Sequence, residues 1–165
     1  MFIYLKSVFV LMALENLILA FEVASFYGSI FFAIIIFVIL WLKEDKKLLL
    51  LFVLDFAIIS GIVYGLKFFI RAPRPNFTGE LPFYETSFPS GHSARAFFYS
   101  VILSQRFRGL FQYLLYLLAI LTAIGRIVTA EHFPIDVFVG SIIGFGVSWF
   151  SIKYQNKILK LSKIF

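Results

Sequence analysis

The chain has 165 residues, of which 61% are hydrophobic and only 15% are charged, and its mean hydropathy is +0.96. Soluble domains carry about 25% charged residues, so one small core cannot hide this much apolar surface and lipid must solvate part of it. The absence of cysteine excludes disulfides, thiolate metal sites and a cysteine nucleophile. The net charge of +6 does not indicate a nucleic-acid partner, because the basic residues are spread between apolar segments without a glycine-rich phosphate loop.

Six apolar stretches follow one another along the chain, and each predicts a membrane-spanning helix of about 20 residues. They cover residues 2–21, 24–42, 47–69, 93–105, 110–130 and 136–152. The fourth reaches the required length only when it is counted from Ser90. Glu15 and Asn16 interrupt the first, so we expect a retained helix rather than a signal peptide. The sequence therefore predicts one membrane-embedded domain over residues 1–165, an all-α integral membrane bundle of six transmembrane helices.

The basic residues distinguish the two ends of this bundle. With six spans, Lys6, the clusters "KEDKK" and "QRFRG" and the C-terminal lysines fall on one side, which the positive-inside rule makes cytoplasmic. We therefore expect a multi-pass cell-membrane protein with both termini in the cytoplasm. Positive charge at the opposite ends of the helices favours an anionic partner on the extracytoplasmic face. The basic residues expected there are Lys67, Arg71, Arg74, Arg95 and Arg126.

Two segments are expected to present anion-binding groups at that face. In "KFFIRAPRP" the prolines end the third helix, so Lys67 lies about one turn inside the helix and Arg74 lies in the following loop. In "PSGH" Ser90 is a good N-cap for the fourth helix. The amides of Gly91 and His92 are then placed to bind an anion with help from the helix dipole.

The segment "GRIVTAEHFPID" adds a third set of groups, with Arg126 near the end of the fifth helix. Asp136 follows His132 by four residues and can reach one of its ring nitrogens. A carboxylate on one imidazole nitrogen leaves the lone pair of the other free to attack. His92, the second histidine of the chain, can then protonate a leaving oxygen while the cations hold a phosphoryl group.

These motifs share a spacing: Lys, six residues, Arg-Pro; then Pro-Ser-Gly-His; then Arg, five residues, His, three residues, Asp. The pattern resembles the type 2 phosphatidate phosphatase superfamily, which also includes vanadium-dependent haloperoxidases and bacterial acid phosphatases. The resemblance covers the six-helix layout and, in detail, about residues 60–140. Gly125 is a departure, because the family usually has a serine there that helps to bind phosphate.

The resemblance implies that His132 attacks phosphorus to form a phosphohistidine, that Asp136 orients it, and that His92 protonates the leaving group. It implies a set of phosphate-binding residues, namely Lys67, Arg74, Ser90, Gly91 and Arg126. This chemistry requires no metal or other cofactor, and the sequence has neither an acidic cluster suited to Mg²⁺ nor a good zinc site. Arg95 is a possible contact to a second phosphate or headgroup, since an SGH-x-x-R pattern looks like that of relatives acting on isoprenoid diphosphates.

The predicted function is a lipid phosphatase whose partners are a lipid phosphate and the surrounding membrane lipids. A polyprenyl (undecaprenyl-type) diphosphate is the first choice of substrate, and phosphatidylglycerophosphate, phosphatidate and lipid A phosphate are the alternatives. A non-catalytic lipid-binding or transport protein is a second class, against which the intact His92, His132 and Asp136 argue. A membrane location disfavours the third class, a haloperoxidase.

Overall fold

The computed structural model describes residues 2–76 and 86–161, and their side chains from residue 10 to residue 160. All regular elements in these ranges are helical, which confirms the predicted all-α fold. In chain order they are α1 (Phe2–Ser25), the 3-10 turn η1 (Phe26–Gly28), α2 (Ile30–Leu42), α3 (Lys46–Ile70), α4 (Gly91–Leu103), α5 (Leu110–Val128) and α6 (Pro134–Leu161). Lys6 and Lys163 lie outside the side chains described.

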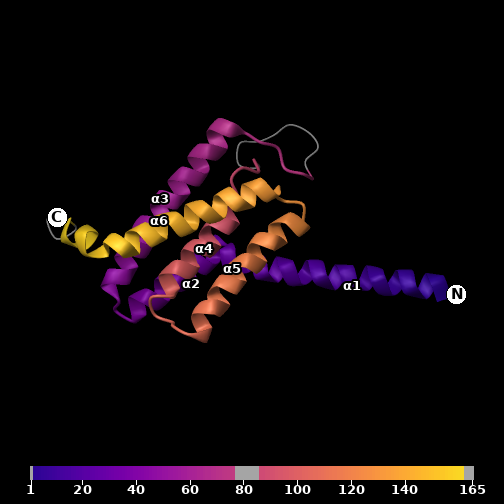
Figure 1. The fold of residues 1–165 in the computed structure, drawn as a ribbon, viewed down its shortest axis with the longest axis horizontal. Helices are drawn as coiled ribbons and strands as arrows, with labels where there is room; N and C mark the ends of the chain where they lie inside the picture. The colour runs from indigo at the N-terminus through magenta and orange to yellow at the C-terminus, as the bar shows by residue number, and fades with distance from the viewer. Residues whose placement is uncertain (1, 77–85, 162–165) are drawn as a thin grey trace.

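Helix α4 forms the centre of the bundle and packs against α3, α5, α6 and η1 (Figure 1). Its aromatic residues Phe98 and Tyr99 are fully buried, so the helix has little surface to offer to lipid. Its polar groups are bonded internally: the Tyr99 hydroxyl donates to the Ser29 carbonyl at 2.9 Å, and Ser100 Oγ donates to the Leu115 carbonyl at 2.8 Å. A buried polar group needs such a partner because water cannot reach it.

Glycines let the neighbouring backbones approach α4 closely. A Cβ atom at Gly140 or Gly144 of α6 would overlap the carbonyl oxygen of Ser90 or Ala94, respectively. The two glycines are four residues apart and therefore share one face of α6, as in membrane helix pairs that pack through small residues. This packing holds the first turn of α4 against the first turns of α6.

Four helices are long and apolar enough to cross a membrane by length and composition, and their candidate spans are Val10–Gly28, Lys46–Ile70, Leu110–Val128 and Pro134–Lys160. Helices α2 and α4 have 13 residues each, or about 20 Å, against a hydrocarbon thickness of about 30 Å. The six predicted helices therefore form, but two are shorter than a simple span. Helix α2 is short because Ser29 caps it, accepting from the amide of Phe32 at 3.1 Å.

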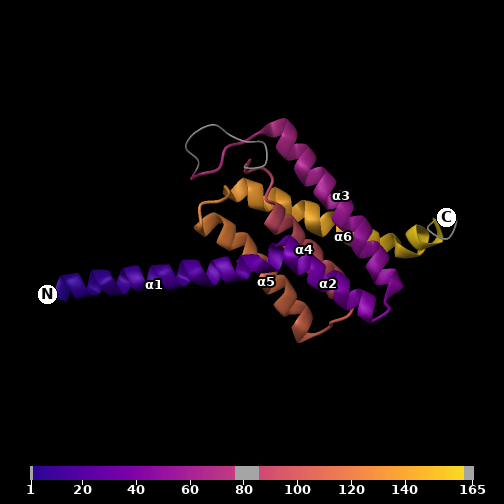
Figure 2. The ribbon, with the colours of Figure 1, turned by 180° about the vertical axis from the view of Figure 1, so that it is seen from behind.

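Helix α1 leaves the bundle instead of folding back along α2, as two opposite views show (Figures 1 and 2). Only its last turns are held by α5, where Thr122 Oγ1 donates to the Ala24 carbonyl at 2.8 Å. The side chains described along the rest of α1 are exposed and mostly apolar, Leu14 and Leu17 among them, with Glu15 and Asn16 as polar exceptions. The first two predicted helices, α1 and α2, therefore do not pack side by side as an antiparallel pair.

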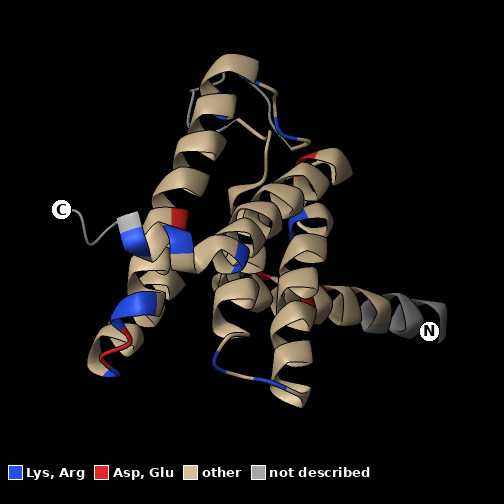
Figure 3. Ribbon diagram, turned by 60° about the vertical axis from the view of Figure 1, so that its left-hand side comes forward, with Lys and Arg blue, Asp and Glu red and all other residues tan. Residues whose placement is uncertain are grey.

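Basic residues gather at the end of the bundle formed by the α2–α3 turn, the α4–α5 loop and the C-terminal part of α6 (Figure 3). Arg106 of the loop pairs with Asp45 of the turn at 3.2 Å, which joins the two clusters. The end of α3, the start of α4 and the α5–α6 connection lie at the opposite end (Figure 1). The three predicted motifs therefore meet at one end of the molecule.

Candidate active site

The connection between α5 and α6 places His132 over the end of α5. The backbone amides of Glu131 and His132 both donate to the carbonyl of Arg126, at 3.2 and 3.0 Å. These bonds satisfy a carbonyl that the ending helix would otherwise leave without a partner. The imidazole of His132 is 3% exposed. The same turn of backbone thus fixes Arg126 and His132 relative to each other.

Asp136 caps the start of α6 and faces His132. Its Oδ2 accepts from the amide of Phe133 at 2.9 Å, an arrangement in which an acid in the first turn bonds back to the helix start. The same oxygen lies 3.7 Å from His132 Nδ1, which is longer than a hydrogen bond. The Asp136 carbonyl accepts from the amide of Ser90 at 2.9 Å. The backbone of Asp136 therefore links the third motif to "PSGH", while its side chain faces the imidazole of His132.

The surroundings of His132 keep its imidazole neutral. Burial, followed by the positive charges of Arg126, Lys67 and Arg74, lowers the pKa of His132 far below its ordinary value of 6.5. Its Nδ1 has no hydrogen-bond partner within 2–76 and 86–161. A neutral imidazole retains the lone pair that a nucleophile needs.

Two arginines converge on one carboxylate at the rim of the site. Glu131 Oε2 pairs with Arg74 and lies 3.2 Å from Arg126 Nη2. The Nε of Arg126 is buried without a hydrogen-bond partner in the described part of the chain. Guanidinium groups bind carboxylates and phosphates through the same geometry, so these two arginines form a ready anion site that Glu131 occupies.

Lys67 fastens the end of α3 to the segment that leads into α4. Its Nζ donates to the carbonyls of Thr86 and, at 3.5 Å, Ser87. The amide of Ser87 in turn donates to the Ala72 carbonyl at 2.8 Å. Lys67 is 6% exposed, so its charge belongs to the interior of the site. Arg71, in contrast, turns outward, with its guanidinium 5.7 Å from the centre of the Phe68 ring.

The start of α4 contributes His92 to the same cluster. His92 interacts electrostatically with Arg126, Arg95, Arg74 and Lys67, and also with His132. A Cβ at Gly28 would overlap the His92 carbonyl, so η1 packs directly on this first turn. Both imidazoles therefore lie in one field of positive charge.

Ser90 and Gly91 lie at the site, and both also have roles in the packing of the first turn of α4. Ser90 is fully buried, and its Oγ accepts from the amide of Ser93 at 3.4 Å and from Ser93 Oγ at 3.0 Å. It is therefore the predicted N-cap. The Nη1 atom of Arg95 lies 3.2 Å from the position a Cβ would take on Gly91. Arg95 is buried, and its Nε donates to the Gly28 carbonyl at 2.8 Å.

Gly125 faces α1 rather than the cation cluster. A Cβ there would lie 3.0 Å from the Phe21 carbonyl oxygen and 3.3 Å from Ser25 Oγ. A serine at this position would therefore require α1 to move. The glycine lets the last turns of α1 rest on α5.

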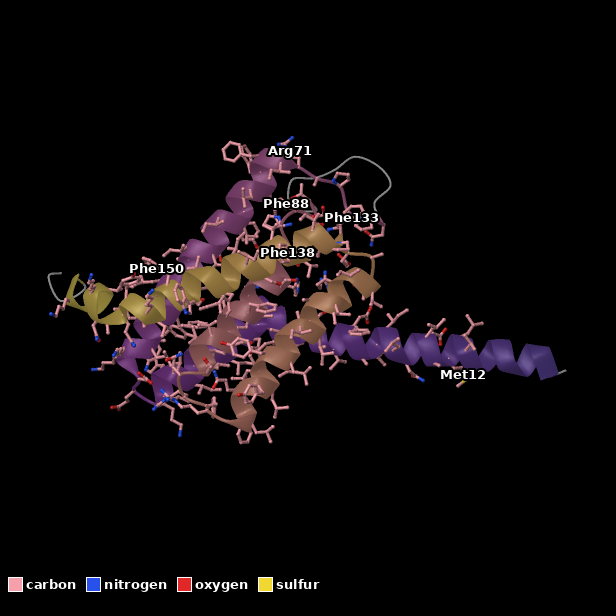
Figure 4. All side chains as sticks on the ribbon, viewed as in Figure 1. Met12, Arg71, Phe88, Phe133, Phe138 and Phe150 are labelled. Carbon is pink, nitrogen blue, oxygen red and sulfur yellow. The ribbon has the colours of Figure 1, made fainter. Side chains whose placement is uncertain are left out.

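Sequence reasoning missed Glu131. It stands directly before His132 in "AEHFPID" and five residues after Arg126, and this position was the available signal. The pairing was hidden because Arg74 belongs to a segment far away in the chain. Figure 4 shows how the ends meet, with Phe88, before the "PSGH" motif, and Phe133, beside His132, at the same end of the molecule as Arg71.

The family model described as "PAP2 superfamily" matches residues 46–160. The chain therefore belongs to the PAP2 superfamily, and the predicted resemblance to type 2 phosphatidate phosphatases is confirmed. Among solved structures, the crystal structure of Aquifex aeolicus LpxE is similar with a TM-score of 0.74 and 30% sequence identity. The match covers 84% of this chain and 87% of the LpxE chain. A search of curated proteins finds no match.

Family membership and the membrane-grade helices together define the class of protein. The chain is a membrane lipid phosphatase, an enzyme that acts on lipid substrates in the membrane. This class agrees with the motifs at the end of the bundle.

Proposed function

We propose that the chain hydrolyses a phosphate from a lipid phosphate or diphosphate through a phosphohistidine on His132. The observation that supports this most directly is the neutral, buried His132 with Asp136 at one ring nitrogen and cations around it. A polyprenyl diphosphate remains the first choice of substrate. Phosphatidylglycerophosphate, phosphatidate and lipid A phosphate remain the alternatives.

The proposed reaction has two chemical steps. Asp136 holds the Nδ1–H of His132, so Nε2 attacks phosphorus and the bond from phosphorus to the leaving oxygen breaks. Burial and the charge of Arg126 lower the pKa of His92 to about 3 in the free enzyme, so in this proposal the bound phosphate brings the proton that His92 then gives to that oxygen. Neutral His92 then takes a proton from water, which attacks the phosphohistidine and releases inorganic phosphate. The separation of 3.7 Å between His132 and Asp136 shortens to a hydrogen bond on binding, as catalytic hydrogen bonds often do.

The cations have two roles in this proposal. Lys67, Arg74 and Arg126 hold the phosphoryl oxygens. They are joined by Ser90 and Gly91 and the backbone amides at the start of α4. They also stabilise the charge that develops in the transition state. Arg95 interacts electrostatically with His92, Lys67 and Arg126. It is the proposed contact for a second phosphate when the substrate is a diphosphate.

The remaining features of the proposal concern the setting of the reaction. The whole chain acts as one membrane-embedded domain, without a metal or other cofactor. The basic end that contains Arg106, Asp45 and the C-terminal part of α6 faces the cytoplasm, and the active site faces the extracytoplasmic side of the cell membrane. The phosphate enters while the lipid tail stays in the outer leaflet.

Phosphate release from a panel of the four candidate lipids in detergent micelles tests the activity and ranks the substrates. His132→Ala should abolish release, because it removes the proposed nucleophile that Asp136 faces. Full activity of this variant would disprove the phosphohistidine mechanism. Trapping a labelled, acid-labile phosphohistidine in the wild type would demonstrate the intermediate directly.

A further inference from the structure

An apolar groove of about 540 Å³ runs between α5 and α6 on the outside of the bundle. Many of the side chains along it are exposed, including Ile124 and Ile127 of α5 and Phe138 and Phe145 of α6. The groove is therefore open to the lipid rather than closed inside the protein. Its complete lining is Phe97, Ile120, Ala123, Ile124, Ile127, Pro134, Val137, Phe138, Ser141, Ile142, Phe145 and Gly146.

One end of the groove lies at the candidate active site. Ile127 and Val137 directly follow Arg126 and Asp136 in the sequence, and Pro134 begins α6 two residues after His132. The groove then follows α6 as far as Gly146, twelve residues beyond Pro134, which is about 18 Å along the helix axis. The groove therefore begins on the same helix turns that carry Arg126 and Asp136.

The lining offers nothing for a polar ligand to bind. Ser141 is its polar side chain, and Ser141 Oγ donates to the Val137 carbonyl at 2.8 Å. Helix α6 turns its glycine face, with Gly140 and Gly144, towards α4. The α6 side chains that line the groove, Phe138, Ile142 and Phe145, remain exposed. Phe97 of α4, partly buried against the core, lies at the groove as well.

We infer that this groove holds one hydrocarbon tail of the lipid phosphate while its headgroup lies on the cation cluster, an inference that rests on the proposed function. The charge of the site and the apolar character of the groove match the two parts of such a molecule, in the order in which they are joined. The enzyme is therefore selective for the length of the hydrocarbon tail as well as for the phosphate group.

The physical contribution of the groove is positioning. A tail that enters from the bilayer leaves one apolar medium for another, so transfer from water supplies little driving force. Packing along α5 and α6 instead holds the phosphorus atom near His132, which raises the rate by orientation. Blocking the groove should therefore act on kcat/KM for long-tailed substrates rather than on partition into micelles.

Two leucine substitutions shorten the groove at different depths. A Cβ at Gly146 meets nothing within 4 Å, so Gly146→Leu fills the far end of the groove without displacing the backbone. Ser141→Leu fills it closer to the site, seven residues from Pro134, or about 10 Å along the helix. Gly61→Leu on α3 is the matched control, because Gly61 is also helical with open space around it and does not line the groove.

The assay compares kcat/KM for n-alkyl phosphates that differ only in tail length. Gly146→Leu should lower the ratio of the long-tail to the short-tail value by about fivefold, the lower cost of forcing extra methylenes into filled space. Ser141→Leu should move the loss to shorter tails, and Gly61→Leu should follow the wild type. If the wild type hydrolyses these substrates and all three variants share its tail-length profile, the inference is wrong while the proposed function stands.

Photo-crosslinking tests the groove without requiring turnover. An alkyl phosphate with a diazirine in its tail should label α5 and α6 at Ile124, Phe138 or Phe145, and orthovanadate should suppress this labelling. Equal labelling by the corresponding alkyl alcohol, unaffected by vanadate, would identify ordinary membrane lipid and overturn the inference. If the expected labelling is observed but the chain has no phosphatase activity, the inference about the groove stands and the proposed function is disproved.

Discussion

Replacing Glu131 by Gln should tighten the binding of phosphate-like anions, because its carboxylate occupies the two arginines that are proposed to hold the phosphoryl group. Glu131 pairs with Arg74 and lies 3.2 Å from Arg126. Substrate phosphate must either displace this carboxylate or bind beside it. In both cases the negative charge of Glu131 opposes binding, and Gln removes that charge while keeping nearly the same volume.

The magnitude follows from the geometry of the two pairs. At 3.2 Å and an effective dielectric constant of about 20, a pair of unit charges interacts by about 5 kcal/mol. The side chains are partly open to solvent, 14% for Arg126 and 28% for Glu131. Screening of such pairs brings the net value to about 1 kcal/mol each. Removing the competition from one or both pairs should therefore tighten anion binding by about 5- to 30-fold.

The measurement is the inhibition constant of orthovanadate against hydrolysis of a lipid phosphate in micelles, at low and at moderate salt. Glu44→Gln is the control, since it makes the same change of charge on an exposed residue at the opposite end of the bundle. An inhibition constant in Glu131→Gln that is unchanged or weaker would refute the reasoning. A weaker value would show that Glu131 instead holds the arginines in their binding geometry.

Three further predictions concern His132, the α4–α6 contact and the cofactor. Because the folded pKa of His132 is lowered, the unfolded chain binds a proton first as the pH falls below 6.5, so the stability contributed by neutral His132 is lost towards acid. The ¹⁵N spectrum of histidine-labelled His92→Asn protein should show neutral His132 at pH 5, and an imidazolium signal there would contradict this. Gly144→Ala should lower the thermal midpoint in detergent far more than Gly61→Ala, since a Cβ at Gly144 overlaps the Ala94 carbonyl whereas Gly61 has open space; equal midpoints would exclude that contact. EDTA should leave phosphate release unchanged, and loss of activity that Mg²⁺ or Zn²⁺ restores would refute the metal-free mechanism.

The sequence by itself predicted the features that depend on hydrophobicity or on residues a few positions apart. Helix positions follow from the apolar stretches, because lipid leaves the backbone no alternative hydrogen-bond partners. The facing pair of His132 and Asp136 follows from their spacing of four residues, since the turn between them is short. Ser90 as N-cap follows from its place directly before the fourth predicted helix.

The tertiary structure decided how distant helix ends meet. Arg74 and Glu131, Lys67 and the Thr86 carbonyl, and Arg95 and the Gly28 carbonyl are pairs from different segments. No local pattern links their members. It also decided that α1 leaves the bundle and that α5 and α6 leave a groove. These outcomes depend on which surfaces fit together, above all where glycines let backbones touch, and such fit belongs to the folded shape rather than to any single stretch of residues.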